Sequence, residues 1–123
     1  MTPRERMDAF AKGEEIDRLI CIPDMGVTMV PFIGKKASDY YHSAEIMAEL
    51  EIALFERLRH DSVGISTSLR GVAEAMGSKV GYPDYGISYL IEPAVKSVDE
   101  IEYLKVPDPL KDGILPILIE AIR

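Results

Sequence analysis

Cysteine, histidine and long apolar runs are scarce in this sequence. Its 123 residues include one cysteine, Cys21, and two histidines. One cysteine cannot form an internal disulfide or supply the paired thiolates of a structural zinc site, which is typical of a protein from a reducing compartment. No apolar run approaches the roughly 20 residues that span a bilayer, and residues 1–19 lack the apolar centre of a signal peptide. The sequence therefore predicts a cytoplasmic protein that does not cross a membrane.

The sequence also contains fewer basic than acidic residues. The sequence has 14 lysines and arginines against 21 aspartates and glutamates, which gives a net charge of -7. A surface of this charge repels phosphate groups, so the sequence argues against binding of nucleic acid or anionic lipid. The sequence contains no internal repeat and no low-complexity segment. With 47% hydrophobic residues, the chain fits one globular domain over residues 1–123.

Two short apolar runs, separated by a long amphipathic pattern, are typical of a parallel β-α-β unit. Residues 19–22 are rich in branched side chains and stop at Pro23, which predicts a strand buried on both faces, with Cys21 as a small core residue. Residues 61–67 predict a second strand. Between the two strands, apolar positions recur every three or four residues from 43 to 60, which predicts a helix. These patterns indicate an α/β fold.

The remaining segments predict shorter elements. Thr2 to Glu5 form a capping box with proline at the first helical position, so a helix should begin there and end near Gly13. Residues 23–39 predict a loop with a helical turn at 28–33. The other expected elements are a helix at 69–76, an antiparallel excursion at 80–91, a short helix opened by a second capping box from Ser97 to Glu100, and a helix at 114–122.

Three stretches, in order and at matching spacing, carry a family resemblance. They are Arg4-Glu5-Arg6 through Gly13 to Asp17-Arg18, the segment from Asp61 to Pro83, and the segment from Ser97 to Pro109. Together they resemble the N-terminal third of the uroporphyrinogen decarboxylase superfamily and, within it, the branch of methylcobalamin:coenzyme M methyltransferases. The resemblance implies the N-terminal part of a TIM-barrel-like (β/α)8 fold, incomplete in this chain.

The resemblance also permits a comparison with the decarboxylase itself, in which two arginines after the first strand hold substrate carboxylates and an aspartate ends the second strand. Counting from Pro31 places the arginine positions on Asp24 and Thr28. Counting from Asp61 places the aspartate position on Ser68. All three residues are replaced, and a carboxylate at Asp24 would repel a substrate carboxylate. The resemblance therefore favours methyl transfer over porphyrinogen decarboxylation.

The methyltransferase branch, by resemblance, uses a zinc ion held by one histidine and two cysteines. This zinc binds a thiol, whose thiolate then attacks the methyl group of a corrinoid. Those ligands lie in the family's C-terminal half, so we expect no metal site, no cofactor and no catalytic residue in this chain. Zinc and a corrinoid protein are expected for the complete family member. The expected function is that of the N-terminal portion of a corrinoid-dependent methyltransferase-like protein, not active by itself.

A second hypothesis is a non-catalytic subunit or remnant that acts through assembly with another polypeptide. Two parallel strands leave an exposed edge, and helix faces would lack the cover that a closed barrel provides. We therefore expect a homo-oligomer or a missing C-terminal barrel portion as the partner, with a corrinoid protein as a further partner of the methyltransferase. The helix residues expected to lack cover include Ile46, Leu50, Leu54, Ile114, Ile117 and Leu118.

The residues that follow the two predicted strands are the candidate ligand-facing group, because chemistry in barrel folds gathers at the carboxyl ends of strands. We expect Asp24 and Ser68 to lie near each other. The alternative is that these side chains only satisfy backbone groups in loops. The candidates are Asp24, Met25, Gly26 and Thr28 after the first strand, and Ser66, Ser68 and Arg70 after the second.

Other chemically capable residues have structural interpretations. His42 precedes the long helix and is interpreted as a neutral residue of its capping region, and His60 as a partner of that helix's last carbonyls. Charged residues along the helix, Glu51 among them, are interpreted as a solvated face. The tyrosines either line a pocket or partner surface, or pack within the antiparallel excursion, which strand propensity favours. These tyrosines are Tyr40, Tyr41, Tyr82, Tyr85 and Tyr89.

Overall fold

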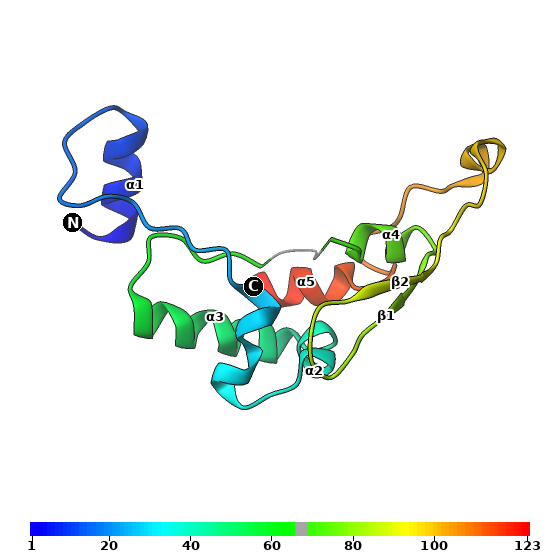
Figure 1. Cartoon of the computed structure of the whole chain (residues 1–123). Helices are drawn as coiled ribbons and strands as arrows, with labels where there is room; N and C mark the ends of the chain where they lie inside the picture. Colours follow the sequence, from blue (N-terminus) through cyan, green and yellow to red (C-terminus); the bar gives the residue numbers. More distant parts are fainter. Residues whose placement is uncertain (66–68) are drawn as a thin grey trace.

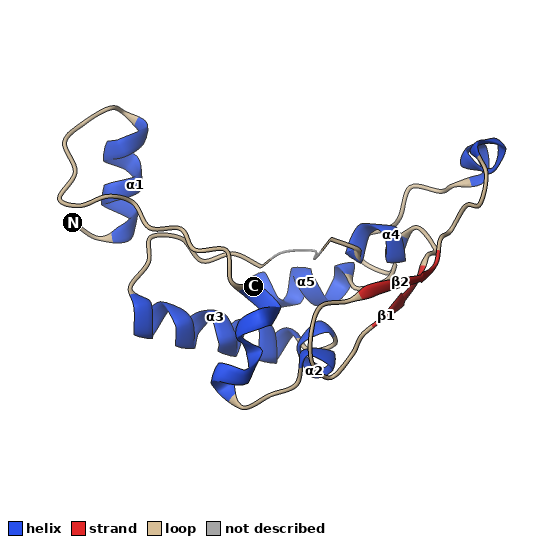
Figure 2. Cartoon of the chain, in the orientation of Figure 1, coloured by secondary structure: helices blue, strands red, loops and turns tan. Residues whose placement is uncertain are grey.

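The structure is a computed structural model that describes residues 1–65 and 69–123. Figure 1 shows an open arrangement in which α3 and α5 lie in the middle, while α1 and the 3-10 helix η2 project at opposite ends; Figure 2 shows that helices and loops predominate over strands. The elements are α1 (Pro3–Ala11), η1 (Gly26–Ile33), α2 (Ala37–Tyr41), α3 (Ala44–Leu58), α4 (Gly71–Ala75), β1 (Lys79–Gly81), β2 (Tyr89–Glu92), η2 (Val98–Tyr103) and α5 (Leu115–Ile122).

The first helix begins at the predicted capping box. The backbone N–H of Glu5 donates to the Thr2 hydroxyl, and the backbone N–H of Thr2 donates to the Glu5 carboxylate at 2.7 Å. These two bonds satisfy N–H groups that have no partner inside the helix. Gly13, with φ of 72°, follows the end of α1, so both predicted limits are confirmed.

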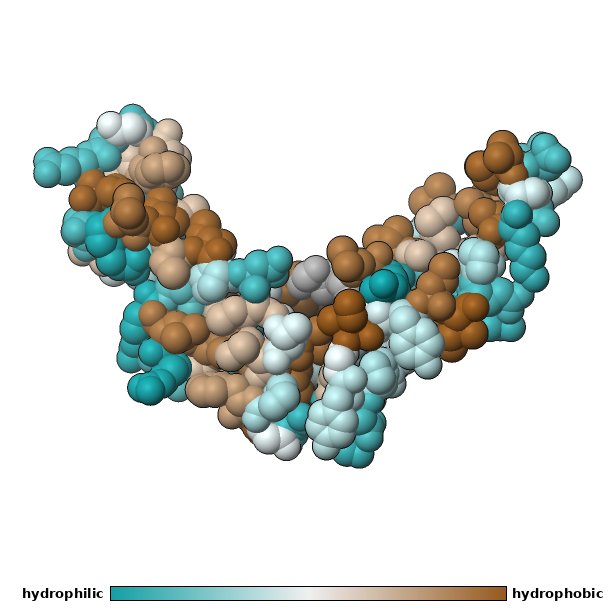
Figure 3. Space-filling model, in the orientation of Figure 1, coloured by the Kyte–Doolittle hydropathy of each residue, from teal (hydrophilic) through white to brown (hydrophobic). Residues whose placement is uncertain are grey.

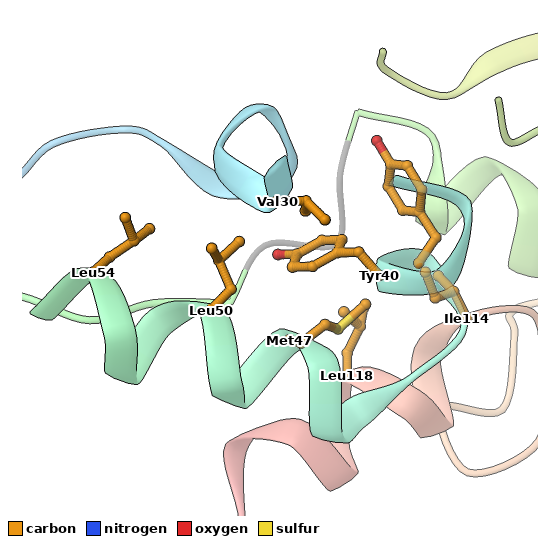
Figure 4. Close-up of a cluster of buried hydrophobic side chains, with 8 residues drawn as sticks. Val30, Tyr40, Met47, Leu50, Leu54, Ile114 and Leu118 are labelled. Atoms are coloured by element: carbon orange, nitrogen blue, oxygen red, sulfur yellow. The ribbon is translucent and has the colours of Figure 1, made fainter. Parts of the chain in front are cut away.

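The core forms around α3, the helix predicted at 43–60. The Ser43 hydroxyl accepts from the Ile46 N–H at 3.2 Å and caps its N-terminus. Met47, Leu50 and Leu54 recur on one face and are almost fully buried. Full burial of such side chains contributes about 1.5–3 kcal/mol each. Figure 4 shows Val30 of η1 and Tyr40 of α2 over this face, with Leu118 of α5 beside it.

The expectation that these helix faces would lack cover is wrong. Leu50, Leu54, Ile114 and Leu118 are each at most 5% exposed. α3 contacts η1, α2 and α5, which together cover its apolar face. The sequence predicted only a loop with one helical turn before residue 39, and so it missed α2 and underestimated how much apolar surface η1 brings to the core.

The two predicted parallel strands are not strands in the described part of the chain. Residues 19–22 and 61–65 run side by side as extended segments (Figure 1), joined by a bond from the Asp61 N–H to the Cys21 carbonyl oxygen at 2.8 Å. Residues 66 and 67 of the second segment lie outside the description. Burial on both faces is also wrong: Leu19 is 87% exposed and Cys21 is exposed. A β-ladder forms only where successive backbone N–H and C=O groups of two segments pair, and an apolar composition does not by itself provide that pairing.

A buried carboxylate joins these two segments to α1. The Asp61 side chain is fully buried and accepts hydrogen bonds from Arg6, from Arg18 and, at 2.8 Å, from the Cys21 N–H. Burial opposes ionisation, but the Cys21 N–H and the two guanidinium groups outweigh it, so the pKa of Asp61 lies below its ordinary value. Asp17 pairs with Arg6 and with the N-terminal ammonium group of Met1.

The predicted antiparallel excursion is confirmed as the hairpin of β1 and β2. Val80 pairs with Leu90, and the register shifts between Lys79 and Val80. The tyrosine interpretation holds only in part. Tyr89 lies over Gly81, where a Cβ would come within 2.4 Å of the Tyr89 ring. Tyr82 instead packs on the core tyrosine Tyr41, with ring centroids 4.8 Å apart.

The second predicted capping box does not form. Ser97 stands at the N-cap of η2 but its side chain makes no capping bond. Glu100 accepts instead from the Lys96 N–H at 2.7 Å. The helices predicted at 69–76 and 114–122 are confirmed as α4 and α5, and the turn predicted at 28–33 as η1.

Apolar side chains are exposed on both projecting arms. Figure 3 shows hydrophobic surface over α1 and its following loop, and over the region of the hairpin and η2. Leu19, Val98 and Val106 are each more than 80% exposed. Within residues 1–65 and 69–123, no helix combines the length and hydropathy that crossing a membrane requires.

Candidate functional site

One pocket of about 650 Å³ lies where the segment after residue 21 meets α2, α3 and the residues before β2. Its volume is within the range of about 300–1,000 Å³ typical of small-molecule sites. Apolar side chains, Ile22, Met25 and Ile87 among them, form part of the lining. A second hollow of about 550 Å³ lies between α4 and η2, and none of its lining residues is buried. The first pocket is therefore the stronger candidate site.

Five of the seven ligand-facing candidates line this pocket. Asp24, Met25, Gly26 and Thr28 approach it from one segment, and Arg70 from the N-cap of α4. The remaining two, Ser66 and Ser68, lie outside the described residues, and with them the expected closeness of Asp24 and Ser68. The fold therefore brings the described candidates together at one pocket. That they bind a ligand stays a prediction.

The gathered candidates differ in what their side chains do. The Thr28 hydroxyl donates to the Met25 carbonyl at 2.7 Å, so Thr28 stabilises the first turn of η1. Gly26 adopts φ of 51°, which glycine tolerates best, and Met25 packs against the core. Asp24 and Arg70 bring opposite charges to the lining.

The buried acidic side chain in the pocket is Glu51 of α3, which is only 7% exposed. Its interpretation as part of a solvated face is wrong. Burial raises the pKa of Glu51 above its ordinary value, and the nearby His60 and the backbone of Gly64 offset part of this effect. Glu51 therefore holds a proton more readily than an exposed glutamate.

His60 follows α3 and is 1% exposed at the border of the same pocket. Its ring meets Phe55 edge to face at 5.5 Å, and its Nδ1 has no hydrogen-bond partner among the described residues. The predicted role at the helix end is wrong, because Arg59, with φ of 53°, caps α3 through its N–H bond to the Phe55 carbonyl. His42 instead lies at the C-cap of α2, its Nδ1 2.7 Å from the Ser38 carbonyl oxygen.

Ser88 and two tyrosines of α2, Tyr40 and Tyr41, also line the pocket. The Ser88 N–H donates to the Tyr41 hydroxyl at 3.2 Å, while the Ser88 hydroxyl is buried without a partner among the described residues. Tyr40 packs edge-on to Tyr41 at 5.8 Å. Burial, together with the charge of Glu51, raises the pKa of Tyr40 to about 12. Tyr40 therefore keeps its hydroxyl proton at neutral pH.

This arrangement suits hydrogen bonding and proton exchange better than metal binding. Glu51, His60 and the tyrosine hydroxyls exchange protons or form hydrogen bonds. Across the described residues, no group of three or more histidine, cysteine, aspartate or glutamate side chains is arranged to hold a metal ion. The residues that the structure describes therefore do not fit the zinc site that the family resemblance implied for the complete protein.

Sequence reasoning missed the three buried polar residues Glu51, His60 and Ser88. One signal was available for Glu51: it stands four residues after Met47 and directly after Leu50, which places it beside the apolar stripe of α3. His60 and Ser88 stand in non-helical segments without periodicity, so no local pattern indicates their burial.

Comparison with known proteins shows which proteins this chain is similar to. The model of the uroporphyrinogen decarboxylase (URO-D) family matches residues 2–123. A methyltransferase from Methanosarcina mazei has a similar structure, with a TM-score of 0.76 and 25% sequence identity. The match covers 99% of this chain and 37% of that chain. The comparison with curated proteins found no significant match.

The matched structure identifies the open fold as the N-terminal part of a TIM-barrel-like fold, and the described residues do not close a barrel. Because the family model matches almost the whole length, the chain belongs to the uroporphyrinogen decarboxylase family.

Proposed function

We propose that this chain forms the N-terminal part of a methyltransferase that moves a methyl group from a methyl-corrinoid to a thiol acceptor. The observation that carries the proposal is the likeness to the M. mazei methyltransferase over 99% of the chain. The pocket supports it, because five of the seven residues expected at the mouth of the barrel line it. In this proposal, the chain contributes part of the wall of the substrate pocket.

Porphyrinogen decarboxylation is less well supported. Asp24 and Thr28 stand where the resemblance places substrate-binding arginines, and both line the pocket. A carboxylate at that position disfavours an anionic porphyrinogen. Arg70 is the one cation among the described lining residues.

The isolated chain is proposed to be inactive. It spans 37% of the length of the methyltransferase that it matches, and its described residues do not fit a zinc site. Zinc and a corrinoid protein therefore belong, in this proposal, to the complete assembly. When bound there, zinc would activate the thiol by lowering its pKa.

A second candidate function is that of a non-catalytic subunit that works by assembly. The exposed apolar side chains on the two arms favour it, since contiguous surfaces of this kind commonly mark interfaces. The partner would be a second copy of this chain or a polypeptide that supplies the remaining barrel portion. Both candidate functions require such a partner, and they differ in whether the assembly catalyses.

A chimera separates the two candidate functions. This chain replaces the matching N-terminal 37% of the M. mazei methyltransferase. The chimera, its parent and the isolated chain are each given methylcobalamin and a small thiol, and cobalamin absorbance follows the loss of the methyl group. We expect transfer by the chimera and none by the isolated chain. A folded chimera that is inactive beside an active parent would favour the non-catalytic role.

A further inference from the structure

The pocket has a buried polar wall, which we define as Glu51, His60 and Ser88. Each of the three is at most 7% exposed, and all border the pocket. They come from separate parts of the chain: α3, the segment after α3, and the segment before β2. The His60 Nδ1 and the Ser88 hydroxyl have no hydrogen-bond partner among the described residues.

Two unpartnered polar atoms beside one pocket require an explanation. A buried donor or acceptor without a partner destabilises a fold, and native proteins keep few of them. An apolar residue at position 60 or 88 would avoid that loss. Other lining residues, such as Ile22, Met25 and Ile87, are apolar and need no hydrogen-bond partner. The polar wall is thus retained at a cost to stability, as expected for groups that receive a partner from a ligand.

The charges of the lining residues limit which chemical groups of a ligand can bind there. Among the described lining residues, Asp24 and Glu51 are acidic and Arg70 is basic. Asp24 is exposed and Arg70 is partly buried, whereas Glu51 is buried and lies near His60, so Glu51 is the charged residue closest to the polar wall's centre. Burial raises the pKa of Glu51, which shows that this environment disfavours a carboxylate charge. An anionic ligand group next to Glu51 would meet both desolvation and repulsion.

We infer that the polar wall binds an uncharged group that both donates and accepts hydrogen bonds, such as a carboxamide or a hydroxyl, carried on a small apolar body. The His60 ring and the Ser88 hydroxyl then gain the partners that they lack in the protein alone. The apolar body fills the side of the pocket formed by Ile22, Met25 and Ile87. This inference rests on the proposed function only in treating the pocket as a substrate site.

The ligand test uses ring fragments that differ only in their polar group. Cyclohexanecarboxamide, cyclohexanol, cyclohexanecarboxylate and cyclohexylammonium are titrated into the full chain, and affinities are measured by NMR. We expect the carboxamide and the alcohol to bind at least about tenfold more tightly than either ion, since an unpaired buried charge is the most costly arrangement. The ¹⁵N shift of the His60 Nδ1 should move with the carboxamide. Equal binding of the ions would overturn the inference.

Two near-isosteric variants assign the effect to the polar wall. Ser88→Ala removes a hydroxyl without a partner, so its melting temperature should equal or exceed that of the wild type, while carboxamide affinity falls about tenfold. Glu51→Gln should strengthen cyclohexanecarboxylate binding, because the negative charge beside the ligand is lost. The matched control is Ser78→Ala, which removes the acceptor of the Ala94 N–H outside this pocket. It should lower stability and leave fragment binding unchanged.

The outcomes separate this inference from the proposed function. Ser88→Ala with wild-type carboxamide affinity, or with a marked loss of stability, shows that the hydroxyl serves the fold and overturns the inference. The chimera assay can still succeed in that case, because it measures methyl transfer. Conversely, an inactive chimera leaves the fragment affinities and the effect of Ser88→Ala intact if the polar wall binds as inferred.

Discussion

Arg18 and Asp61, 43 residues apart in the sequence, form a two-point ion pair. The Arg18 Nη1 and Nη2 atoms donate to the two oxygens of the Asp61 carboxylate at 2.6 and 2.9 Å. Arg6 of α1 and the Cys21 N–H add further bonds to the same carboxylate. This group therefore joins α1, the segment around residue 20 and the end of α3, although the described chain has no sheet there.

Asp61→Asn should destabilise the protein strongly. The variant removes the counter-charge of Arg18 and one of the two carboxylates that pair with the buried Arg6, and we expect the melting temperature to fall by about 10 °C or more. Asp84→Asn is the control, since Asp84 pairs with Lys36 on an exposed surface. It should shift the melting temperature by about 2 °C at most. Similar losses in both variants, measured by circular dichroism, would contradict the role of Asp61.

Stability should fall in acid. The Arg6 and Arg18 contacts contribute to lowering the pKa of Asp61, and Arg6 foremost lowers that of Asp17. A lowered pKa in the folded state contributes stability that is present above the unfolded value and is lost as pH falls through the folded value. Urea denaturation should therefore show a decline of stability below about pH 4. Asp61→Asn should flatten that decline; an unchanged slope would count against the assignment.

Glu51 should act in the opposite direction. Burial raises its pKa, so its contribution to stability is full below the unfolded value and is lost as pH rises through the folded value. Glu51→Gln should accordingly be more stable than the wild type at pH 7 and equal to it near pH 4. If the stability curves of the two proteins run parallel between these pH values, ionisation of Glu51 does not destabilise the folded protein.

The purified chain should bind zinc no more tightly than scattered surface groups do. Cys21 is exposed, and the described residues contain no cluster of three metal-ligating side chains. Elemental analysis after dialysis should therefore find far less than one zinc per chain, with or without Cys21→Ser. One equivalent of zinc that the substitution removes would refute this expectation.

The chain should associate when it is expressed alone. Leu19, Leu69 and Val106 are each at least 87% exposed, and the matched methyltransferase has a much longer chain. Burying about 800 Å² of apolar surface gains roughly 20 kcal/mol, which exceeds an association cost of about 4–15 kcal/mol. Light scattering at micromolar concentration should report a dimer or larger species. A 13.7 kDa species would instead mean that the monomer tolerates this exposure.

Elements governed by local rules were predictable. The capping box at Thr2 and the apolar spacing through Met47, Leu50 and Leu54 identify α1 and α3, because both patterns act within one or two helical turns. The hairpin and α5 were predicted for the same reason. The segments at 19–22 and 61–65 were not, since strands form only when another segment pairs with them.

By itself, the sequence determined the positions of α1, α3 and α5, the family resemblance and the group of residues that includes Asp24 and Arg70. Local propensity and spacing are properties of residues that are close in the sequence, so they can be recognised without a structure. Only the tertiary structure decided that Glu51, His60 and Ser88 are buried beside one pocket and that Cys21 is exposed. Burial depends on which distant segments cover a residue, and that is settled when η1, α2 and α5 pack around α3.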